Sequence, residues 1–356
     1  MKTFLKRIAP ITLLIKIKKL VDKVDQLAIL IFAKTKMTSS LYYFLFNSSF
    51  MREHQSVLKG RIKYYESLES IEDSCVLLRR NIHRLEKGLI MRPRRDVFGN
   101  AFIGETVSSF ILAIEQDAVK ESERTWFIDV LSEYFEVVSS SPEIDAAREE
   151  FYRVCSGSKI SNQSKSIPYS HKSIPKADIS FEQLEMLFKQ RRSVRWYEDR
   201  DVDVNLIRKA VNIATQAPSA CNRQPFKFHT VTNKGLVKKV ADCAMGTVGF
   251  SHNLKTIIAV VGELSSYPAE RDRHVIYIDG ALVTMQLMLA LETLGLSTCA
   301  INWPDIESRE KMLDELLGLK KYERTIMLLA VGYADPEGGI PYSQKKDCTD
   351  LIKVVK

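Results

Sequence analysis

The chain has 356 residues, of which 45% are hydrophobic and 27% are charged, the balance of a globular protein with a sizeable core. This length predicts about two domains. The net charge of +8 lies in residues 1–60, which hold 11 Lys and Arg against 3 Asp and Glu, while the remaining 296 residues are neutral. Because a nucleic-acid-binding enzyme carries basic residues over its folded surface, this distribution argues against nucleic acid as a partner.

Residues 1–60 are predicted to form a basic helical segment. Within it, apolar residues recur three and four positions apart with lysines between them, which is typical of an amphipathic helix. Two interpretations stay open: residues 1–35 contact an anionic membrane surface, or the helix packs on its own enzyme domain or on a partner helix. The apolar positions are Leu14, Ile17, Val21, Val24, Ala28 and Ile31.

The sequence predicts no secretory signal and no membrane-spanning segment. Lysines interrupt the first apolar run, and no small-residue cleavage site follows it. The run over residues 27–33 is far shorter than the roughly 18 residues that a membrane-spanning helix needs. The six cysteines form no C-x-x-C pair and have no histidine at zinc spacing. We therefore expect reduced thiols, no metal site and a cytoplasmic protein.

Residues 61–155 are expected to form a helical region, with helices over 103–116 and 126–138 and a break over 139–142. An earlier helix follows Ser74, and Gly88 is a plausible C-cap for it. In that helix His83 and Arg84 lie among other titratable residues, and a basic run at 92–95 follows. Such side chains suit an anionic substrate held against a cofactor; alternatively, they form a solvated helix end. Residues 156–178, rich in Ser, Lys, Pro and Asn, are the predicted linker.

Residues 179–356 alternate helices and strands, which predicts an α+β or α/β layered fold. Ser180 is the expected N-cap of the first helix. The segment Ala281–Leu291 is apolar almost all round, as in a helix that is buried from several sides. Helices are predicted over 181–190, 205–216, 236–244, 279–294 and 307–317, and strands over 226–232, 256–261, 297–303 and 325–333.

Two clusters in this half carry the candidate site. Arg191, Arg192, Ser193 and Arg195 place three guanidinium groups around a hydroxyl, which supplies forked donors for a phosphate and for the oxygen-rich edge of an isoalloxazine. One predicted helix later, the turn Ala217–Pro225 contains a Pro-Ser-x-x-Asn-x-Gln-Pro pattern that presents amide groups. The chain has no G-x-G-x-x-G before a helix and no Walker loop, so a fixed NAD site of the Rossmann type is not predicted.

Together the two clusters resemble the FMN-dependent nitroreductase family, over about the C-terminal half of the chain. The resemblance implies a mixed sheet enclosed by helices, a homodimer whose core is the helix around Ala281–Leu291, and FMN at the subunit interface. It also implies that NADH or NADPH visits the substrate's pocket and leaves. The implied FMN-binding residues are Arg191, Arg192, Ser193, Arg195, Pro218, Ser219, Asn222, Gln224, Ile301, Asn302 and Lys345.

The sequence departs from a common family pattern at Asn302-Trp303, where simple nitroreductases often carry Glu-Gly. An indole above the flavin ring would make Trp303 a substrate residue beside His83 and Arg84, and activity on nitroaromatics does not follow; alternatively, Trp303 only caps a strand. Near the end of the chain, Lys345 matches the family's last basic contact to the phosphate, with Gln344 or Lys346 in a shifted register. No catalytic acid or base is predicted, because the flavin carries most of the chemistry.

The resemblance implies an FMN-dependent oxidoreductase that uses NAD(P)H to reduce an unidentified small molecule, or its flavin to oxidise one. Proteins that resemble this longer form are often met among surface-polysaccharide genes, which suggests an envelope metabolite. The alternative function is a flavin-binding or membrane-surface interaction protein with a vestigial catalytic pocket.

Overall fold

The computed structural model describes residues 11–69, 75–156 and 165–355. The chain divides into two compact units: residues 1–55 with 305–307, and residues 56–304 with 308–356. The helix α4 (Met51–Glu69) begins in the smaller unit, and its residues from Ser56 belong to the larger one.

The smaller unit contains two helices, α2 (Ile11–Phe32) and α3 (Lys36–Leu45). A capping box between Thr35 and Thr38 begins α3. The Tyr42 hydroxyl donates to Asp25 on α2, and the Tyr42 ring packs on Phe32 with 6.0 Å between the ring centroids. The predicted amphipathic helix is therefore confirmed as a helix. None of the side chains described on it is buried, and that of Leu14 lies outside the described part.

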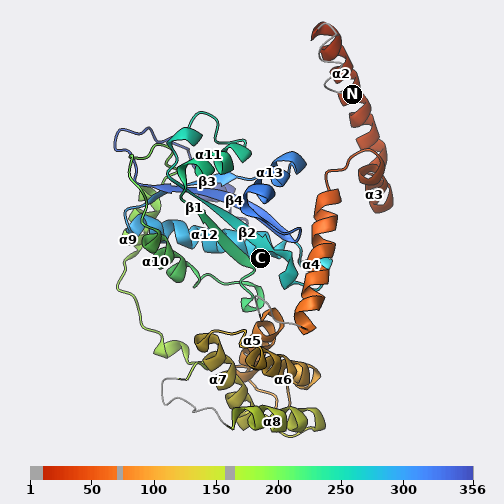
Figure 1. Ribbon diagram of the computed structural model, residues 1–356, viewed down its shortest axis with the longest axis vertical. Coiled ribbons are helices and arrows are strands. Elements are labelled where there is room, and N and C mark those ends of the chain that lie inside the picture. The colour runs from red at the N-terminus through yellow and green to blue at the C-terminus, as the bar shows by residue number, and fades with distance from the viewer. Residues whose placement is uncertain (1–10, 70–74, 157–164, 356) are drawn as a thin grey trace. The chain divides into compact units, whose positions relative to one another are not determined.

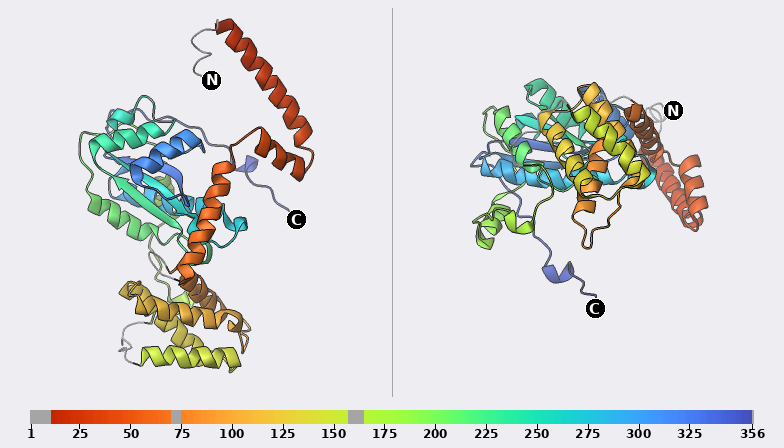
Figure 2. Two further views of the ribbon diagram at one scale, coloured as in Figure 1. Left: turned by 45° about the vertical axis from the view of Figure 1, so that its right-hand side comes forward. Right: turned by 90° about the horizontal axis from the view of Figure 1, so that it is seen from below.

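A bundle in the larger unit consists of α5 (Val76–Leu89), α6 (Asn100–Glu115), α7 (Glu121–Val137) and α8 (Pro142–Cys155), seen together in Figure 2. Ser141 caps α8 by accepting from the Ile144 N–H, and Pro142 occupies the first turn. The predicted break over 139–142 thus separates α7 from α8, which begins at Pro142. The largest fully buried aromatic side chains of the bundle are Phe110, Phe127, Tyr134 and Phe151.

The prediction that Gly88 ends the first bundle helix is wrong, because α5 continues to Leu89. A Cβ atom at Gly88 would lie 2.4 Å from the ring of Phe98. Gly88 is therefore required for the close approach of this ring to α5.

One four-stranded sheet contains β1 (Phe226–Val231), β2 (Thr256–Glu263), β3 (Ser297–Asn302) and β4 (Glu323–Gly332), in the order β1-β2-β4-β3. Its three ladders are antiparallel, and an isolated bridge between Ser193 and Thr298 is parallel. On one face lie α10 (Val204–Ala214) and α12 (Val275–Thr293), and on the other α11 (Lys234–Cys243) and α13 (Glu307–Leu317) (Figure 1). The predicted α+β class is confirmed.

The predicted elements of this domain are also confirmed, with shifts at some ends. The helix α9 (Phe181–Gln190) starts at a capping box formed by Ser180 and Gln183. In contrast, α12 begins at Val275, four residues before its predicted start. The added turn is rich in β-branched residues, which are weak helix formers, but Ile276 is fully buried in it. Tertiary packing therefore outweighs local propensity at this end.

The helix α12 is apolar on most sides but is not covered on all of them. Residues 270–293 have the length and composition of a membrane-spanning helix, a run that the sequence prediction overlooked, and core helices of soluble domains meet the same criteria. In the larger unit, α12 packs on α10 and β2. A stripe on its remaining face is exposed: Ile278 by 51%, Leu282 by 43% and Met285 by 38%.

Candidate flavin-binding site

The arginine cluster directly follows α9 and lies beside β3, a strand at the edge of the sheet. Arg191 is the C-cap of α9, and its backbone N–H donates to Leu187 O. Next, Ser193 pairs with Thr298, and the Val194 N–H donates to Thr298 O at 3.0 Å. Val194 points into the core and is 6% exposed. The core therefore fixes the backbone of the cluster, and the polar side chains around Val194 are half-buried.

The arginine cluster has a carboxylate nearby, Glu292, but forms no ion pair with it. None of Arg191, Arg192 and Arg195 forms an ion pair with a carboxylate in the part of the chain that the structure describes. Glu292, near the end of α12, accepts a hydrogen bond from Gln190 Nε2 at 3.2 Å. Burial raises the pKa of Glu292, whereas this bond and the charge of Arg191 lower it. Three guanidinium groups that form no ion pair with a described carboxylate can bind an anion such as a phosphate.

The second cluster is a turn with an unusual backbone. Cys221, Asn222 and Gln224 have φ values of 54°, 53° and 51°. This left-handed region costs a residue with a side chain about 1 kcal/mol or more. The turn is held internally by the Gln224 N–H, which donates to Ser219 Oγ at 3.1 Å, and by Gln224 Nε2, which donates to Asn222 Oδ1 at 3.1 Å. Backbone strain that is held by its surroundings in this way is typical of binding sites.

Asp279 fixes this turn to the start of α12. Its Oδ2 accepts from the Ala220 N–H at 2.9 Å, and the side chain is 3% exposed. Burial raises the pKa of Asp279, whereas the Ala220 N–H, Tyr267 and the charge of Arg223 lower it. Sequence reasoning missed Asp279. A carboxylate in the middle of an apolar run is the signal that could have found it.

The helical bundle also contacts the turn. Arg79 on α5 donates from Nε to Asn222 O at 3.4 Å, and it forms an ion pair with Glu123 on α7. Beside the turn residue Asn222, Arg223 lies over the ring of Tyr267, with 4.9 Å from Cζ to the centroid. Neither Arg79 nor Arg223 was predicted to have a role, because no local pattern relates Arg79 to the turn or Arg223 to Tyr267.

The structure does not bring the two clusters together within one chain. Asp279, which holds the turn, and Glu292, beside the arginine cluster, are thirteen residues apart on α12. At a helical rise of about 1.5 Å per residue, this separation is about 20 Å. Among the described residues, no hydrogen bond or ion pair joins the two clusters. A single chain therefore holds the two predicted clusters apart from each other.

At the end of β3, Ile301 is 4% exposed, Asn302 is exposed and Trp303 is 8% exposed. The Trp303 indole N–H donates to Glu310, which is itself 1% exposed, and the ring belongs to the core cluster of the sheet. This position fits the structural interpretation of Trp303 better than a substrate contact.

Among the described residues, no hydrogen bond or ion pair joins His83, Arg84 or Lys345 to the arginine cluster. His83 Nδ1 lies 3.2 Å from Glu86 Oε2, and Glu86 also accepts from the Trp126 indole at 2.9 Å. Arg84 faces a cavity of the bundle. Lys345 lies on an exposed C-terminal segment, where its carbonyl accepts from Gln344 Nε2 at 3.0 Å. Over residues 11–69, 75–156 and 165–355, no three His, Cys, Asp or Glu side chains are grouped to hold a metal ion.

The sheet domain matches a known family. The model of the "Nitroreductase family" matches residues 188–252 and 246–333. The C-terminal half of the chain is therefore a nitroreductase-family domain, and a helical region precedes it. The helices α2–α8 lie before the matched residues.

Individual proteins are similar to parts of this chain. The "Putative NADH dehydrogenase/NAD(P)H nitroreductase" of Archaeoglobus fulgidus is 29% identical over 155 residues, which cover 43% of this chain and 86% of the relative. The "Putative NAD(P)H nitroreductase YdgI" of Bacillus subtilis is 27% identical over 193 residues, covering 44% of this chain and 90% of the relative. The solved structure of an "FMN-dependent Nitroreductase" from Clostridium difficile is 23% identical, with a TM-score of 0.38, and covers 44% of this chain and 91% of its own.

Proposed function

We propose that this protein is an FMN-dependent oxidoreductase that takes electrons from NADH or NADPH and reduces a small molecule. The observation that carries the proposal is the arginine cluster, which presents three guanidinium groups and the Ser193 hydroxyl on a backbone fixed to β3. A phosphate group matches these forked donors in geometry and in charge. The activities in the names of the Archaeoglobus and Bacillus relatives support the same reaction class.

The residues present fit FMN. Arg191, Arg192 and Arg195 would hold its phosphate and the oxygen-rich edge of its ring, and the strained turn would contribute the side-chain amides of Asn222 and Gln224. When bound, FMN supplies hydride and electron transfer at its ring. The protein's own groups bind and orient the cofactor. Ile301, Asn302 and Lys345 complete the proposed set, with β3 against the ring and Lys345 near the phosphate.

The complete site is proposed to need a homodimer. The stripe of Ile278, Leu282 and Met285 is an apolar surface that a second copy would cover. In a two-fold symmetric dimer with the two α12 helices antiparallel, the start of one helix lies beside the end of the other. The turn held by Asp279 in one subunit then meets the arginine cluster of its partner. Each complete site would then combine two clusters that lie about 20 Å apart within one chain.

We propose a cytoplasmic location and, as the substrate, an envelope metabolite. The exposed apolar residues of α2 favour an additional contact of residues 1–35 with a membrane surface, which is compatible with the enzyme. The same surface supports the alternative of an interaction protein with a vestigial pocket.

An anaerobic visible spectrum of the purified protein with FMN, before and after addition of NADH or NADPH, tests the proposal. Bleaching of the bound flavin, with recovery in air, is the expected result. A protein that binds no flavin would contradict the proposal and favour the interaction protein. Bound flavin that neither nucleotide bleaches would contradict the electron donor only.

A further inference from the structure

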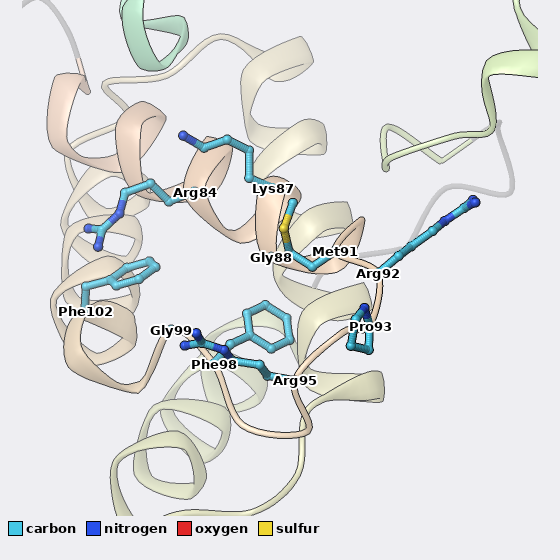
Figure 3. Close-up of a pocket in the computed structure, with 10 residues that line it drawn as sticks. All are labelled: Arg84, Lys87, Gly88, Met91, Arg92, Pro93, Arg95, Phe98, Gly99 and Phe102. Carbon is cyan, nitrogen blue, oxygen red and sulfur yellow. The ribbon is translucent and has the colours of Figure 1, made fainter.

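A basic cavity lies in the helical bundle, outside the residues that match the family. Its volume is about 500 Å³, within the usual range for small-molecule sites. It lies between the end of α5, the loop after it and the start of α6 (Figure 3). Four of its lining residues are cationic and none is acidic: Arg84, Lys87, Arg92 and Arg95. The cavity therefore carries an excess of positive charge.

The structure gives none of these four cations an ion pair with a described carboxylate. Arg84 Nη1 donates to the neutral Asn81 Oδ1 at 3.2 Å. The charge of Glu105 on α6 raises the pKa of Arg84, but Glu105 does not line the cavity. It already accepts a hydrogen bond from Asn81 Nδ2 at 2.8 Å. Burial lowers the pKa of Arg84, and the charge of Arg80 lowers it further. A bound anion would relieve this repulsion.

Aromatic side chains form the walls of the cavity. The Arg84 guanidinium lies 3.6 Å from the centroid of the Phe102 ring, and Phe98 is seated against Gly88. In Figure 3 Arg95 turns toward Gly99 and Phe98, whereas Arg92 extends away from the other side chains. Arg84 and Arg95, assisted by Lys87, are thus the groups best placed to hold an anion, and the rings offer an apolar surface to the organic part of a ligand.

The helix α5 connects this cavity to the turn Ala217–Pro225. At one end of α5, Arg79 donates to Asn222 O, and Lys87, eight residues later, lines the cavity. Eight residues of helix span about 12 Å. The charges of the turn residues Cys221 and Arg223 also act on Arg84. A small molecule anchored in the cavity can therefore extend along α5 toward the turn.

We propose that this cavity binds the phosphate group of a phosphorylated small molecule, which is the substrate of the flavin reaction. The choice of substrate class rests on the proposed function, whereas binding in the cavity does not require it. Phosphate is favoured over a single carboxylate because of its larger negative charge. One carboxylate would leave most of the positive charge of the cavity uncompensated, whereas a phosphate or diphosphate would compensate more of it.

The test is calorimetric titration of the FMN-loaded full-length protein with inorganic pyrophosphate at constant ionic strength. The bound flavin occupies the arginine cluster, so that cluster does not contribute a second phosphate site. We expect Arg84→Gln and Arg95→Gln each to weaken pyrophosphate binding by about tenfold or more, the usual effect of losing a charged hydrogen bond. Arg94→Gln is the matched control. It removes the same charge from the same loop but does not line the cavity, and it should change affinity less than about twofold.

Equal weakening by the Arg94 and Arg95 variants would overturn the proposal, because it would show attraction to a basic surface without a defined site. Arg95 is exposed, so its variant should fold even if the Arg84 variant does not. Citrate, a carboxylate of similar charge, should bind more weakly than pyrophosphate; tighter binding of citrate would overturn the choice of phosphate.

An Arg191→Ala protein separates this proposal from the proposed function. If it loses flavin but still binds pyrophosphate in an Arg95-dependent way, the cavity is confirmed independently of the flavin site. If pyrophosphate binding disappears with Arg191, the ligand was in the flavin site, and the proposal is wrong.

Discussion

The helices α2 and α12 are both long and apolar, but they lie in different surroundings. On α12, nine residues are buried, and one stripe around Leu282 stays exposed. On α2, no described side chain is buried, and the exposed face includes Leu20, Val24 and Leu27. A single stripe on a rigid domain suits one specific partner, such as a second copy. A face of exposed apolar residues beside lysines suits a less specific surface that is both apolar and anionic.

The largest expected effect comes from a charge placed in the α12 stripe. Leu282→Glu should dissociate the proposed dimer, because an unpaired carboxylate in an apolar interface costs more than about 3 kcal/mol. FMN retention should be lost as well, since each subunit of the proposed dimer would hold only half of the site. Light scattering after gel filtration and the flavin content measure both effects.

Met312→Glu is the control for this experiment. Met312 is 47% exposed on α13, on the opposite face of the sheet. A Leu282→Glu protein that stays dimeric and retains flavin would contradict the composite site.

Loss of a guanidinium from the arginine cluster should have the next largest effect. Arg191→Ala is expected to weaken FMN binding by about 10- to 100-fold, the usual result of deleting a hydrogen bond between charged groups. Arg84→Ala should change FMN affinity little, because Arg84 lines the cavity of the bundle. Equilibrium titration of the apoprotein with FMN compares the two variants. Equal losses would contradict the assignment of the phosphate site.

The apolar face of α2 can be tested without altering the enzyme domain. In the full-length protein, replacing Leu20 and Leu27 with Ser should reduce co-sedimentation with anionic vesicles by more than tenfold, because burial of each leucine contributes about 1.5–3 kcal/mol. Flavin content should stay unchanged. High salt should weaken the remaining binding.

Truncation before Lys36 gives the reference without the helix. If the intact chain binds vesicles no better than the truncated one, α2 does not contact membranes, and a partner helix becomes the better interpretation.

A smaller effect is expected from Asp279, which ties α12 to the turn. Because burial raises the pKa of Asp279 in the folded state, its contribution to stability is present below the unfolded pKa of about 3.9 and is lost as the pH rises through the folded value. Asp279→Asn keeps an acceptor for the Ala220 N–H but does not titrate. The Tm of the wild type relative to this variant should therefore fall by a few degrees across that pH window. If the difference in Tm between the two proteins is the same at every pH, the pKa of Asp279 does not change on folding.

Local patterns predicted most elements of the fold. Ser180 and the apolar residues after it defined α9 to the residue, and the apolar run from Thr256 gave a strand that is buried on both faces. Gly88 misled because glycine serves both as a C-cap and as a site of close packing, and only the position of Phe98 distinguishes these roles.

The candidate site was predictable only in part. The arginine cluster and the turn are each a short continuous stretch of sequence, so the sequence alone showed their residue types. Asp279, Arg79 and Arg223 were missed, because their roles depend on contacts with segments far away in the chain.

The sequence by itself determined a layered α+β or α/β fold, the basic leading helix and the residue types of the two clusters, because periodicity and residue type act over short stretches of chain. Only the tertiary structure decided that the clusters lie at opposite ends of α12, that Trp303 is buried against Glu310, and that α5 contacts the turn at Asn222. Such contacts depend on how distant segments pack, and packing is a property of the assembled core.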